Sequence, residues 1–290
     1  MKKILLPIVI LSFFGYGADV KSYHIGEIEF ISLKDKETNM GKAILLEPSA
    51  RVVGQMMPDD QNPSSINTFI VKTVDSIVLI DTGYGGGKLS ANLKSINITN
   101  ADIDTVLLTH MHGDHIGGLT LNGERAFKSA KVLVSKKELE YWLSLAPKSA
   151  ANRELVQKII EIYGKDIQTF EWDTFVTPQI KALNAAGHTP GHTAFEIISF
   201  VPNEANISKQ ITDRVLIAGD IIHSLKVQLT EPKMSVTFDV DPKEAAATRA
   251  RVFKEASAQK IKIAGMHIPF SGIGYIVDKG NGSYVFEELR

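Results

Sequence analysis

The spacing of apolar residues predicts strands and helices that alternate from about residue 66 onward. Short β-branched or apolar runs indicate strands, and apolar residues that recur on one face at intervals of three or four indicate helices. The predicted strands cover residues 66–74, 77–80, 105–109, 131–134, 214–218 and 261–264. The predicted helices cover residues 88–96, 135–143, 153–163 and 241–258. This interleaving indicates a mixed α and β protein in which helices cover sheets.

Local signals mark where three of the predicted helices begin or end. Ser135 and Glu138 have the spacing of a capping box, which starts the second helix. Gly164 ends the third helix, since glycine favours the backbone conformation that follows a last helical turn. Asp241 followed by Pro242 is typical of a helix start. The helix boundaries are therefore predicted independently of the apolar spacing.

The N-terminal segment has the layout of a secretory signal. Lys2 and Lys3 precede an apolar run that is followed by small residues. The run is shorter than the roughly 20 apolar residues that a bilayer span requires, although an uncleaved anchor remains the alternative. We expect residues 1–18 to be a cleaved signal peptide and residues 19–290 to form a single domain. The mature chain is then expected in the periplasm or outside the cell, with no stable membrane span.

Composition narrows the classes of function. With 290 residues, 44% of them hydrophobic, the chain can bury a full core. The net charge of -1 provides no field to hold a polyanion, so nucleic acid is excluded as a predicted partner. The chain has no cysteine, which excludes disulfides, thiolate metal ligands and cysteine nucleophiles. Any metal site must therefore use histidines and carboxylates.

Residues of that kind stand at or just beyond the ends of predicted strands. The set holds five of the chain's eight histidines and consists of His110, His112, Asp114, His115, His188, Asp220 and His267. Strand ends are where side chains from distant parts of a sequence converge. Imidazole and carboxylate together suit zinc and neighbouring transition metals, and seven ligands exceed what one tetrahedral ion uses. The set therefore implies two divalent ions, with Zn²⁺ as the expected identity.

In order and separation these residues resemble the ligand series of the metallo-β-lactamase superfamily. The matching segments are His110-x-His112-x-Asp114-His115, Gly187-His188, Gly219-Asp220 and His267, preceded by Asp81-Thr82-Gly83. The resemblance covers about residues 66–270. Tyr141-Trp142-Leu143-Ser144 and residues 219–267 are similar to the methyl parathion hydrolase branch. The resemblance implies the α+β class, with an αββα four-layer sandwich and a dinuclear site at the edge of the sheets.

The resemblance also implies a role for each ligand. The first ion is held by His110, His112 and His188, the second by Asp114, His115 and His267, and Asp220 bridges them. A hydroxide shared by the ions is nucleophilic near neutral pH, because cations lower the pKa of bound water. Asp114 and Asp220 are the predicted catalytic residues, and Asp114 or a metal-bound water is the candidate proton carrier.

Four further residues are predicted to surround the ligands or line the pocket. Asp81 is expected to fix the loop that bears the ligands, although a turn former would look the same. His192 is interpreted as support for its loop, and His223 as either a substrate contact or a structural hydrogen-bonding group. Trp142 is a candidate pocket wall, with helix core as the alternative. Weaker pocket candidates are Phe127, Leu225 and Phe270.

The run Gly85-Gly86-Gly87 invites interpretation as a phosphate-binding loop. It lacks the Lys-Ser/Thr ending and the longer spacing of that motif. A flexible rim near the site is the favoured interpretation.

The leading functional hypothesis is an exported dinuclear hydrolase whose bridging hydroxide attacks an aryl ester, lactone or phosphotriester. Its partner is then a small-molecule substrate, and the features of the chain are compatible with a homodimer. The alternatives are a β-lactamase, a thioester hydrolase of the glyoxalase II kind and a non-catalytic metal-binding protein. A β-lactamase usually presents a cation to the carboxylate of its substrate, and the sequence identifies none.

Overall fold

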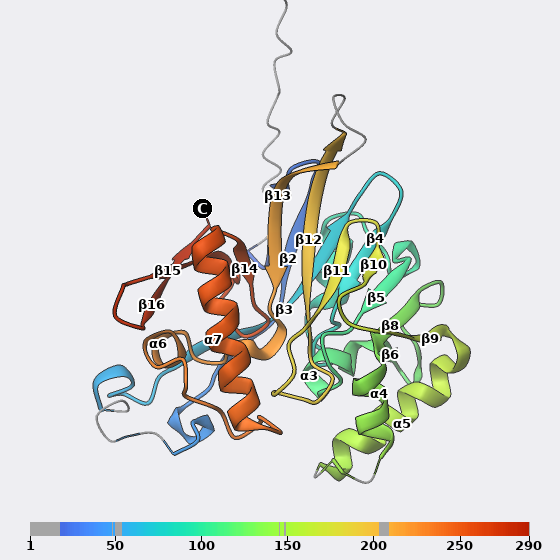
Figure 1. Cartoon of the computed structure of the whole chain (residues 1–290). Coiled ribbons are helices and arrows are strands. Elements are labelled where there is room, and N and C mark those ends of the chain that lie inside the picture. Colours follow the sequence, from blue (N-terminus) through green and yellow to red (C-terminus); the bar gives the residue numbers. More distant parts are fainter. Residues whose placement is uncertain are drawn as a thin grey trace, which may run out of the picture.

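The computed structural model of the protein describes residues 18–47, 49, 54–144, 146–147, 149–202 and 209–289. Residues 1–17 of the predicted signal peptide lie outside the described residues. Two seven-stranded sheets pack face to face, and helices cover the outer face of each sheet (Figure 1). The predicted α+β class and αββα sandwich are confirmed.

The first sheet has the strand order β1-β2-β3-β4-β5-β8-β9. Its strands are β1 (Val20–Ile25), β2 (Ile28–Asn39), β3 (Pro63–Lys72), β4 (Ile77–Ile80), β5 (Thr105–Leu107), β8 (Lys131–Ser135) and β9 (Ile167–Phe170). Strands β1 to β4 pair antiparallel, whereas β4, β5, β8 and β9 pair parallel. The carboxyl ends of the four parallel strands therefore lie at one edge.

The second sheet has the order β10-β11-β12-β13-β14-β15-β16. Its strands are β10 (Phe175–Thr177), β11 (Ile180–Asn184), β12 (Thr193–Pro202), β13 (Lys209–Ile217), β14 (Lys262–Ala264), β15 (Ile273–Asp278) and β16 (Tyr284–Glu288). Only β13 and β14 pair parallel. Because β11 runs in the same direction as β13, the segments that follow β11, β13 and β14 all leave from one edge. A small hairpin pairs β6 (Thr120–Leu121) with β7 (Glu124–Arg125).

Helices cover the outer faces. The α-helices are α2 (Leu89–Ser95), α3 (Gly113–Ile116), α4 (Lys136–Leu143), α5 (Ala150–Tyr163), α6 (Leu225–Thr230) and α7 (Pro242–Gln259). The 3-10 helices are η1 (Lys42–Ile44), η2 (Asn100–Asp102), η3 (Gly117–Leu119), η4 (Gly164–Asp166) and η5 (Gly219–Ile221). Helices α2, α4 and α5 pack on the first sheet, and α6 and α7 on the second. None of the helices in the described part of the chain has the length and hydrophobicity that a bilayer crossing requires.

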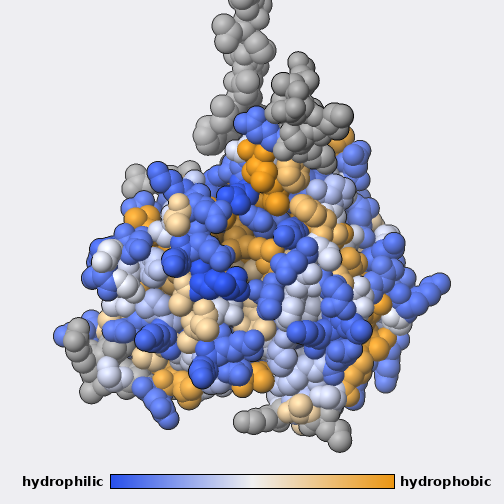
Figure 2. All heavy atoms as spheres, viewed as in Figure 1, coloured by the Kyte–Doolittle hydropathy of each residue, from blue (hydrophilic) through white to orange (hydrophobic). Residues whose placement is uncertain are grey.

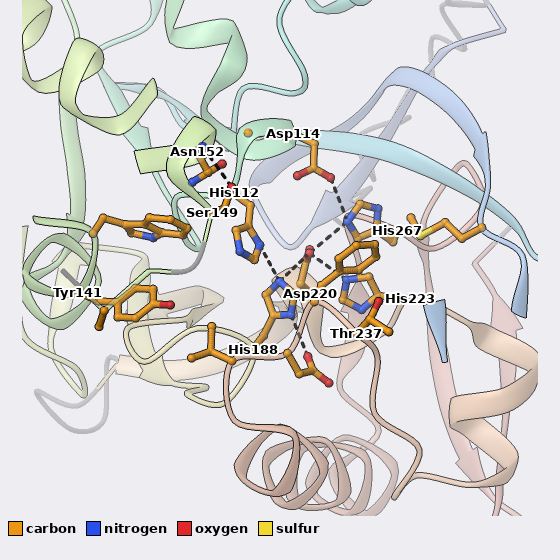
Figure 3. A pocket seen from close by; sticks show the side chains of 17 residues that line it. His112, Asp114, Tyr141, Ser149, Asn152, His188, Asp220, His223, Thr237 and His267 are labelled. Atoms are coloured by element: carbon orange, nitrogen blue, oxygen red, sulfur yellow. Dashed lines mark hydrogen bonds and ion pairs between the residues drawn. The ribbon is translucent and has the colours of Figure 1, made fainter. Parts of the chain in front are cut away.

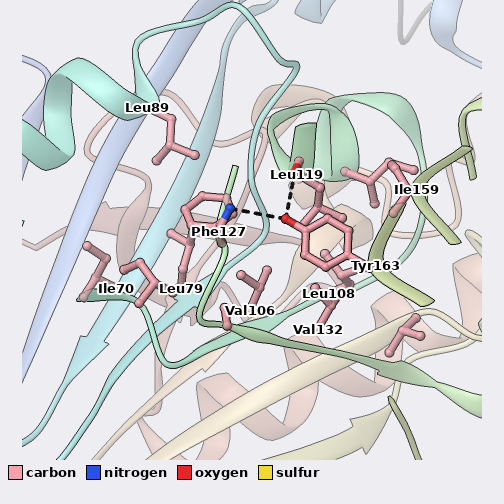
Figure 4. Close-up of a cluster of buried hydrophobic side chains, with 14 of the residues drawn as sticks. Ile70, Leu79, Leu89, Val106, Leu108, Leu119, Phe127, Val132, Ile159 and Tyr163 are labelled. Carbon is pink, nitrogen blue, oxygen red and sulfur yellow. Dashed lines mark hydrogen bonds between the residues drawn. The ribbon is translucent and has the colours of Figure 1, made fainter. Parts of the chain in front are cut away.

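Three apolar layers hold the sandwich together. Phe69 and Phe195 are fully buried between the two sheets. Tyr163 lies under the helices of the first sheet, where its hydroxyl donates to the backbone oxygen of Leu119 at 2.7 Å (Figure 4). Phe253 of α7 is buried against the second sheet. Burying each such side chain contributes about 1.5–3 kcal/mol. On the face drawn in Figure 2, hydrophobic residues gather in a strip over the upper parts of β12 and β13, and the rest is mainly hydrophilic.

The glycines after β4 surround an internal carboxylate. Asp35 accepts hydrogen bonds from the backbone nitrogens of Tyr84, at 3.1 Å, and Leu89, at 2.9 Å. A Cβ atom on Gly83 or Gly87 would lie 2.5 or 2.2 Å from Oδ2 of Asp35, so neither position has room for a side chain. Within the run Gly85-Gly86-Gly87, Gly87 therefore approaches the protein's own carboxylate, whereas a Cβ on Gly85 would lie 2.5 Å from the backbone oxygen of Gly117.

Candidate metal centre

The two sheets bring all seven predicted ligands to one edge of the sandwich. In the first sheet, His110 and His112 follow β5, and Asp114 and His115 lie on α3. In the second sheet, the ligands are His188 in the β11–β12 loop, Asp220 in η5 after β13, and His267 after β14. The parallel pairing of β4 with β5 and of β13 with β14 explains why these segments meet.

Three histidines and Asp220 form the first group of ligand atoms. Nδ1 of His112 lies 3.0 Å from Nε2 of His110 and 3.0 Å from Nε2 of His188. Oδ2 of Asp220 lies 3.3 Å from Nε2 of His188 and 3.7 Å from Nε2 of His110. These four residues offer one ligand atom each, all within 4.8 Å of one another.

Asp114, His115 and His267 form the second group. Nε2 of His267 lies 3.4 Å from Oδ2 of Asp114, and Nε2 of His115 lies 3.7 Å from Oδ1 of Asp114. The carboxylate of Asp220 reaches this group too, with Oδ1 3.1 Å from His115 and Oδ2 3.1 Å from His267. Asp220 therefore lies between the two groups, as Figure 3 shows for the labelled His188 and His267.

Hydrogen bonds on the outer side of the rings orient three of the histidines. Each uses Nδ1 to bind an acceptor: His115 binds Asp81 at 2.6 Å, His188 binds Asp239 at 2.9 Å and His267 binds the backbone oxygen of Ser65 at 3.2 Å. A carboxylate or carbonyl takes the N–H of a neutral imidazole, so Nε2 of each ring presents its lone pair to the centre. Asp81 also accepts from the backbone nitrogen of Thr109 at 2.8 Å, which ties it to the loop after β5.

The centre contains buried polar atoms that no protein group satisfies. Nε2 of His115 and Oδ1 of Asp220 lie 3.1 Å apart without forming a hydrogen bond, and both are buried with no other hydrogen-bond partner. Leaving such an atom unsatisfied costs about 1–3 kcal/mol, and the inward lone pairs repel one another. Divalent cations with nitrogen and oxygen ligands would satisfy both atoms, so the residues present fit two such ions. Without ions, protons on the rings relieve this repulsion. Burial would lower the pKa of His115, but the carboxylates of Asp220, Asp114 and Asp81 raise it well above its usual range. Burial would raise the pKa of Asp220, but the charged histidines, His115 first, hold it well below its usual range.

His192 lies beneath Asp220 and outside the ligand groups. Its Nε2 accepts from the backbone nitrogen of Asp220 at 2.9 Å, and its Nδ1 donates to the backbone oxygen of Ala185 at 2.9 Å. Burial lowers the pKa of His192 to about 3, which keeps the ring neutral and able to accept. A Cβ on Gly219 would lie 2.4 Å from Nε2 of His192, so this contact requires glycine there. The geometry agrees with the interpretation of His192 as loop support.

His223 contacts the carboxylate of Asp220 and lines the cavity. Its Nε2 lies 3.1 Å from Oδ2 of Asp220, and its ring stacks on that of His267 with centroids 4.9 Å apart. Its Nδ1 is buried without a hydrogen-bond partner. The two interpretations left open by the sequence, structural contact and pocket group, are therefore both compatible with its position.

A family model described as "Metallo-beta-lactamase superfamily" matches residues 62–260. The chain belongs to this superfamily. The hydrolase AbOPH, described as a member of the beta lactamase superfamily, is 28% identical in sequence. The structural match covers 94% of this chain and 98% of that chain, with a TM-score of 0.83. The two members therefore share nearly their whole length.

Two further matches are to proteins with different printed activities. The dizinc quorum-quenching lactonase AidC, solved with a product, N-hexanoyl-L-homoserine, is 22% identical and shares the fold. The match has a TM-score of 0.82 and covers 93% of this chain and 97% of that chain. Exodeoxyribonuclease WalJ of Streptococcus pneumoniae is 41% identical over 56 residues, which is 19% of this chain. The match spans 21% of the nuclease, about a fifth of its length.

A cavity of about 610 Å³ opens onto the ligand groups of this superfamily member. Tyr141 and Trp142 line it on the side of His112, and Phe238 lines it on the side of His223. In the described part of the chain, no lysine or arginine lines the cavity. Its walls combine aromatic side chains with polar ones, among them Ser149, Asn152 and Thr237.

The structure also shows where the pocket candidates lie. The position of Trp142 is compatible with both interpretations: it lines the cavity and is only 2% exposed, and its ring centroid lies 5.6 Å from that of His112. The predictions for Phe127, Leu225 and Phe270 are wrong. Phe127 is buried in the first-sheet core, Leu225 packs on the second-sheet core, and Phe270 lines a separate groove.

Three residues that support the site escaped sequence reasoning. Asp239 binds the outer nitrogen of His188. Arg249 of α7 is fully buried, and its Nε donates to the backbone oxygen of Ile221, next to Asp220, at 2.7 Å. Glu138 is fully buried too. The sequence assigned Glu138 only a role at the start of a helix, and no local pattern distinguishes Asp239 or Arg249 from ordinary surface charges.

Proposed function

We propose that the protein is a dinuclear zinc hydrolase, similar to the methyl parathion hydrolase branch, that cleaves neutral lactones, aryl esters or phosphotriesters. The observation that supports this most directly is the carboxylate of Asp220, which lies between the two ligand groups beside the cavity. When bound, two divalent ions supply Lewis acidity and lower the pKa of bound water, to roughly 7 in the best single-zinc cases.

The residues around the ions have separate roles in holding the ions, carrying a proton and contacting the substrate. His110, His112 and His188 hold one ion, and Asp220 contributes an oxygen to both groups. The side chain of Asp114 is 26% exposed and lines the cavity. Its position beside entering substrate suits it to carry a proton to a departing group. His223 lines the same cavity, stacked on His267, and is placed to contact the substrate there.

The cavity favours a neutral substrate. A β-lactam or an acyl-glutathione carries a carboxylate that a binding site normally pairs with a cation, and none lines the described cavity. The walls formed by Tyr141, Trp142 and Phe238 suit an aryl or alkyl group. The lactonase AidC, which shares the fold and was solved with a hydrolysis product, supports lactones as one of these classes. The proposal includes export, which is supported by the layout of residues 1–18.

A substrate panel tests this proposal. Purified protein loaded with two equivalents of zinc is expected to hydrolyse N-acyl lactones, aryl esters or phosphotriesters and to leave nitrocefin and acyl-glutathione unchanged. Turnover is followed by phenolate absorbance or by acid release, with zinc content measured on the same sample. A zinc-loaded protein inert toward all three neutral classes would contradict the proposal, and turnover of nitrocefin alone would make it a β-lactamase.

The apolar wall yields a second expected result. Phe238 is 48% exposed and lines the cavity, so Phe238→Ala removes an aromatic contact and leaves the ligands in place. Such contacts contribute about 0.5–1.5 kcal/mol, so KM for an aryl substrate should rise roughly 2- to 10-fold with kcat little changed. Phe175→Ala is the matched control, because Phe175 is 53% exposed on β10 and does not line the cavity. Equal KM values for Phe238→Ala and Phe175→Ala would show that the aryl group of the substrate binds away from Phe238.

A further inference from the structure

Glu138 is a fully buried carboxylate at the start of α4. The sequence predicts it as half of a capping box, and the structure corrects that prediction. Ser135 does cap the helix, with its hydroxyl accepting from the backbone nitrogen of Glu138 at 3.2 Å. The carboxylate of Glu138 makes its hydrogen bonds elsewhere, with groups around the metal centre.

Four donors satisfy this carboxylate. Oε1 accepts from the backbone nitrogen of Met111 at 2.9 Å and from the indole nitrogen of Trp142 at 2.7 Å. Oε2 accepts from the hydroxyl of Thr189 at 2.6 Å and from the backbone nitrogen of Gly191 at 3.1 Å. Hydrogen bonds to an ionised acceptor are roughly twice as strong as neutral ones. A buried side chain with this many bonds constrains every segment that donates to it.

Three of the four donors lie on the two loops that carry the first ligand group, and the fourth, the indole of Trp142, lies on α4 itself. Met111 stands between His110 and His112 in the chain, so a hydrogen bond to its backbone nitrogen restrains the positions of both histidines. Thr189 directly follows His188. One carboxylate therefore spans the gap between the loop after β5 and the β11–β12 loop, one from each sheet.

The packing around Glu138 shows how closely the second loop approaches. A Cβ on Gly191 would lie 2.0 Å from the backbone nitrogen of Glu138, so only glycine fits there. Ser135 donates its hydroxyl to the backbone oxygen of Gly191 at 2.7 Å, which adds a second link between α4 and this loop. The second ligand group has different supports, since His115 binds Asp81 and His267 binds the backbone of Ser65.

We propose that Glu138 is a positioning residue for one of the two metal ions. By holding both loops, it sets the separation between His188 and the pair His110 and His112, and so the affinity of the first ligand group. It also holds the indole of Trp142, whose edge faces His112, as a wall of the cavity. This inference rests on the metal centre of the proposed function but not on the identity of the substrate.

Metal titration of Glu138→Gln tests this role. The amide offers one acceptor oxygen, and its NH₂ group faces an N–H or O–H donor of one loop. We expect zinc affinity to fall by roughly 10- to 100-fold at one of the two sites, the range seen when a group supporting a ligand is removed, with the other site unchanged. The measurements are competition with a chelating dye and the visible absorption of the Co²⁺-loaded protein.

Two comparisons separate positioning from a general loss of stability. Glu140→Gln, an exposed residue on the same helix, should titrate like the wild type. Thr189→Val removes only one donor and should weaken the same site, whereas Thr189→Ser keeps the hydroxyl and should restore it. The Thr189 pair decides the question if Glu138→Gln does not fold.

The outcomes distinguish this inference from the proposed function. Wild-type protein that binds no zinc would overturn both. Two zinc ions bound with the same affinities in wild type, Glu138→Gln and Thr189→Val would overturn the positioning role alone. An equal weakening of both sites would overturn it too, because a purely structural role predicts no difference between them.

Discussion

Replacing Asp220 by alanine is expected to abolish hydrolysis and to release at least one of the two ions. Asp220 is the residue whose carboxylate contacts both ligand groups, with Oδ1 3.1 Å from His115 and Oδ2 3.3 Å from His188. Its removal leaves the inward lone pairs of five histidines and Asp114 without the negative charge that balances two cations. Loss of one electrostatic group in a reaction centre costs about 10²–10³-fold in rate, and loss of an ion costs more, so we expect a decrease of at least about a thousandfold.

Two further variants make this result interpretable. Asp220→Asn keeps the size of the side chain and removes its charge, so it separates loss of shape from loss of charge. Asp75→Ala, in the exposed turn between β3 and β4, removes a carboxylate far from the ligands and should have wild-type zinc content and kcat/KM. Elemental analysis and kinetics on the same preparations give both readouts. An Asp220→Ala protein that keeps two ions and its activity would refute the bridging role.

Replacing Arg249 by methionine is expected to cause the largest loss of stability. Its guanidinium is buried and donates to the backbone oxygens of Ile221 at 2.7 Å, Met234 at 2.7 Å and Pro232 at 3.1 Å. Burial lowers the pKa of Arg249 to about 10, which still leaves it charged at neutral pH. Nη2 of Arg249 lies 3.8 Å from Oδ2 of Asp239. Removing one partner of such a buried pair costs about 3–5 kcal/mol.

Equilibrium unfolding in urea measures this cost. Arg251→Met is the matched control, because Arg251 lies on the same helix with an exposed side chain and should cost less than about 1 kcal/mol. Arg249→Met should also weaken metal binding, because Arg249 contacts Asp239, which holds His188, and Ile221, which is adjacent to Asp220. If both variants unfolded at the same urea concentration as the wild type, Arg249 would not be the link we infer.

The local sequence predicted most of the elements that carry the site. The predicted helix over residues 241–258 is α7, and the predicted strands at 77–80 and 261–264 are β4 and β14, within one residue at each end. The predicted strand 105–109 ends earlier, at Leu107, because Thr109 turns away to bind Asp81. Strand β2 was not predicted, because Lys34, Lys36 and other charges interrupt its apolar pattern. The strand forms nonetheless, since it pairs with a neighbour on each side.

The ligands themselves could be predicted from short segments of the sequence. Four of them fall within six residues after a predicted strand, and Asp220 and His267 closely follow predicted strands. Strand β11, which precedes His188, was not predicted. The order of the motifs then implied the four-layer fold through resemblance. Neither source indicated which histidine nitrogen faces the centre, because that depends on acceptors from other segments.

The supports of the site became visible only after folding. Glu138 and Thr189 are 51 residues apart, and so are His188 and Asp239, yet each pair is joined by a hydrogen bond of 2.6 to 2.9 Å. In the sequence Glu138 has the spacing of a helix cap, and Arg249 looks like an ordinary charge on an amphipathic helix. Local sequence patterns identify the residues that can bind a metal. The packing of the two sheets against each other determines which buried charged side chains hold those residues in place. That packing depends on contacts between distant segments, which no short window of sequence contains.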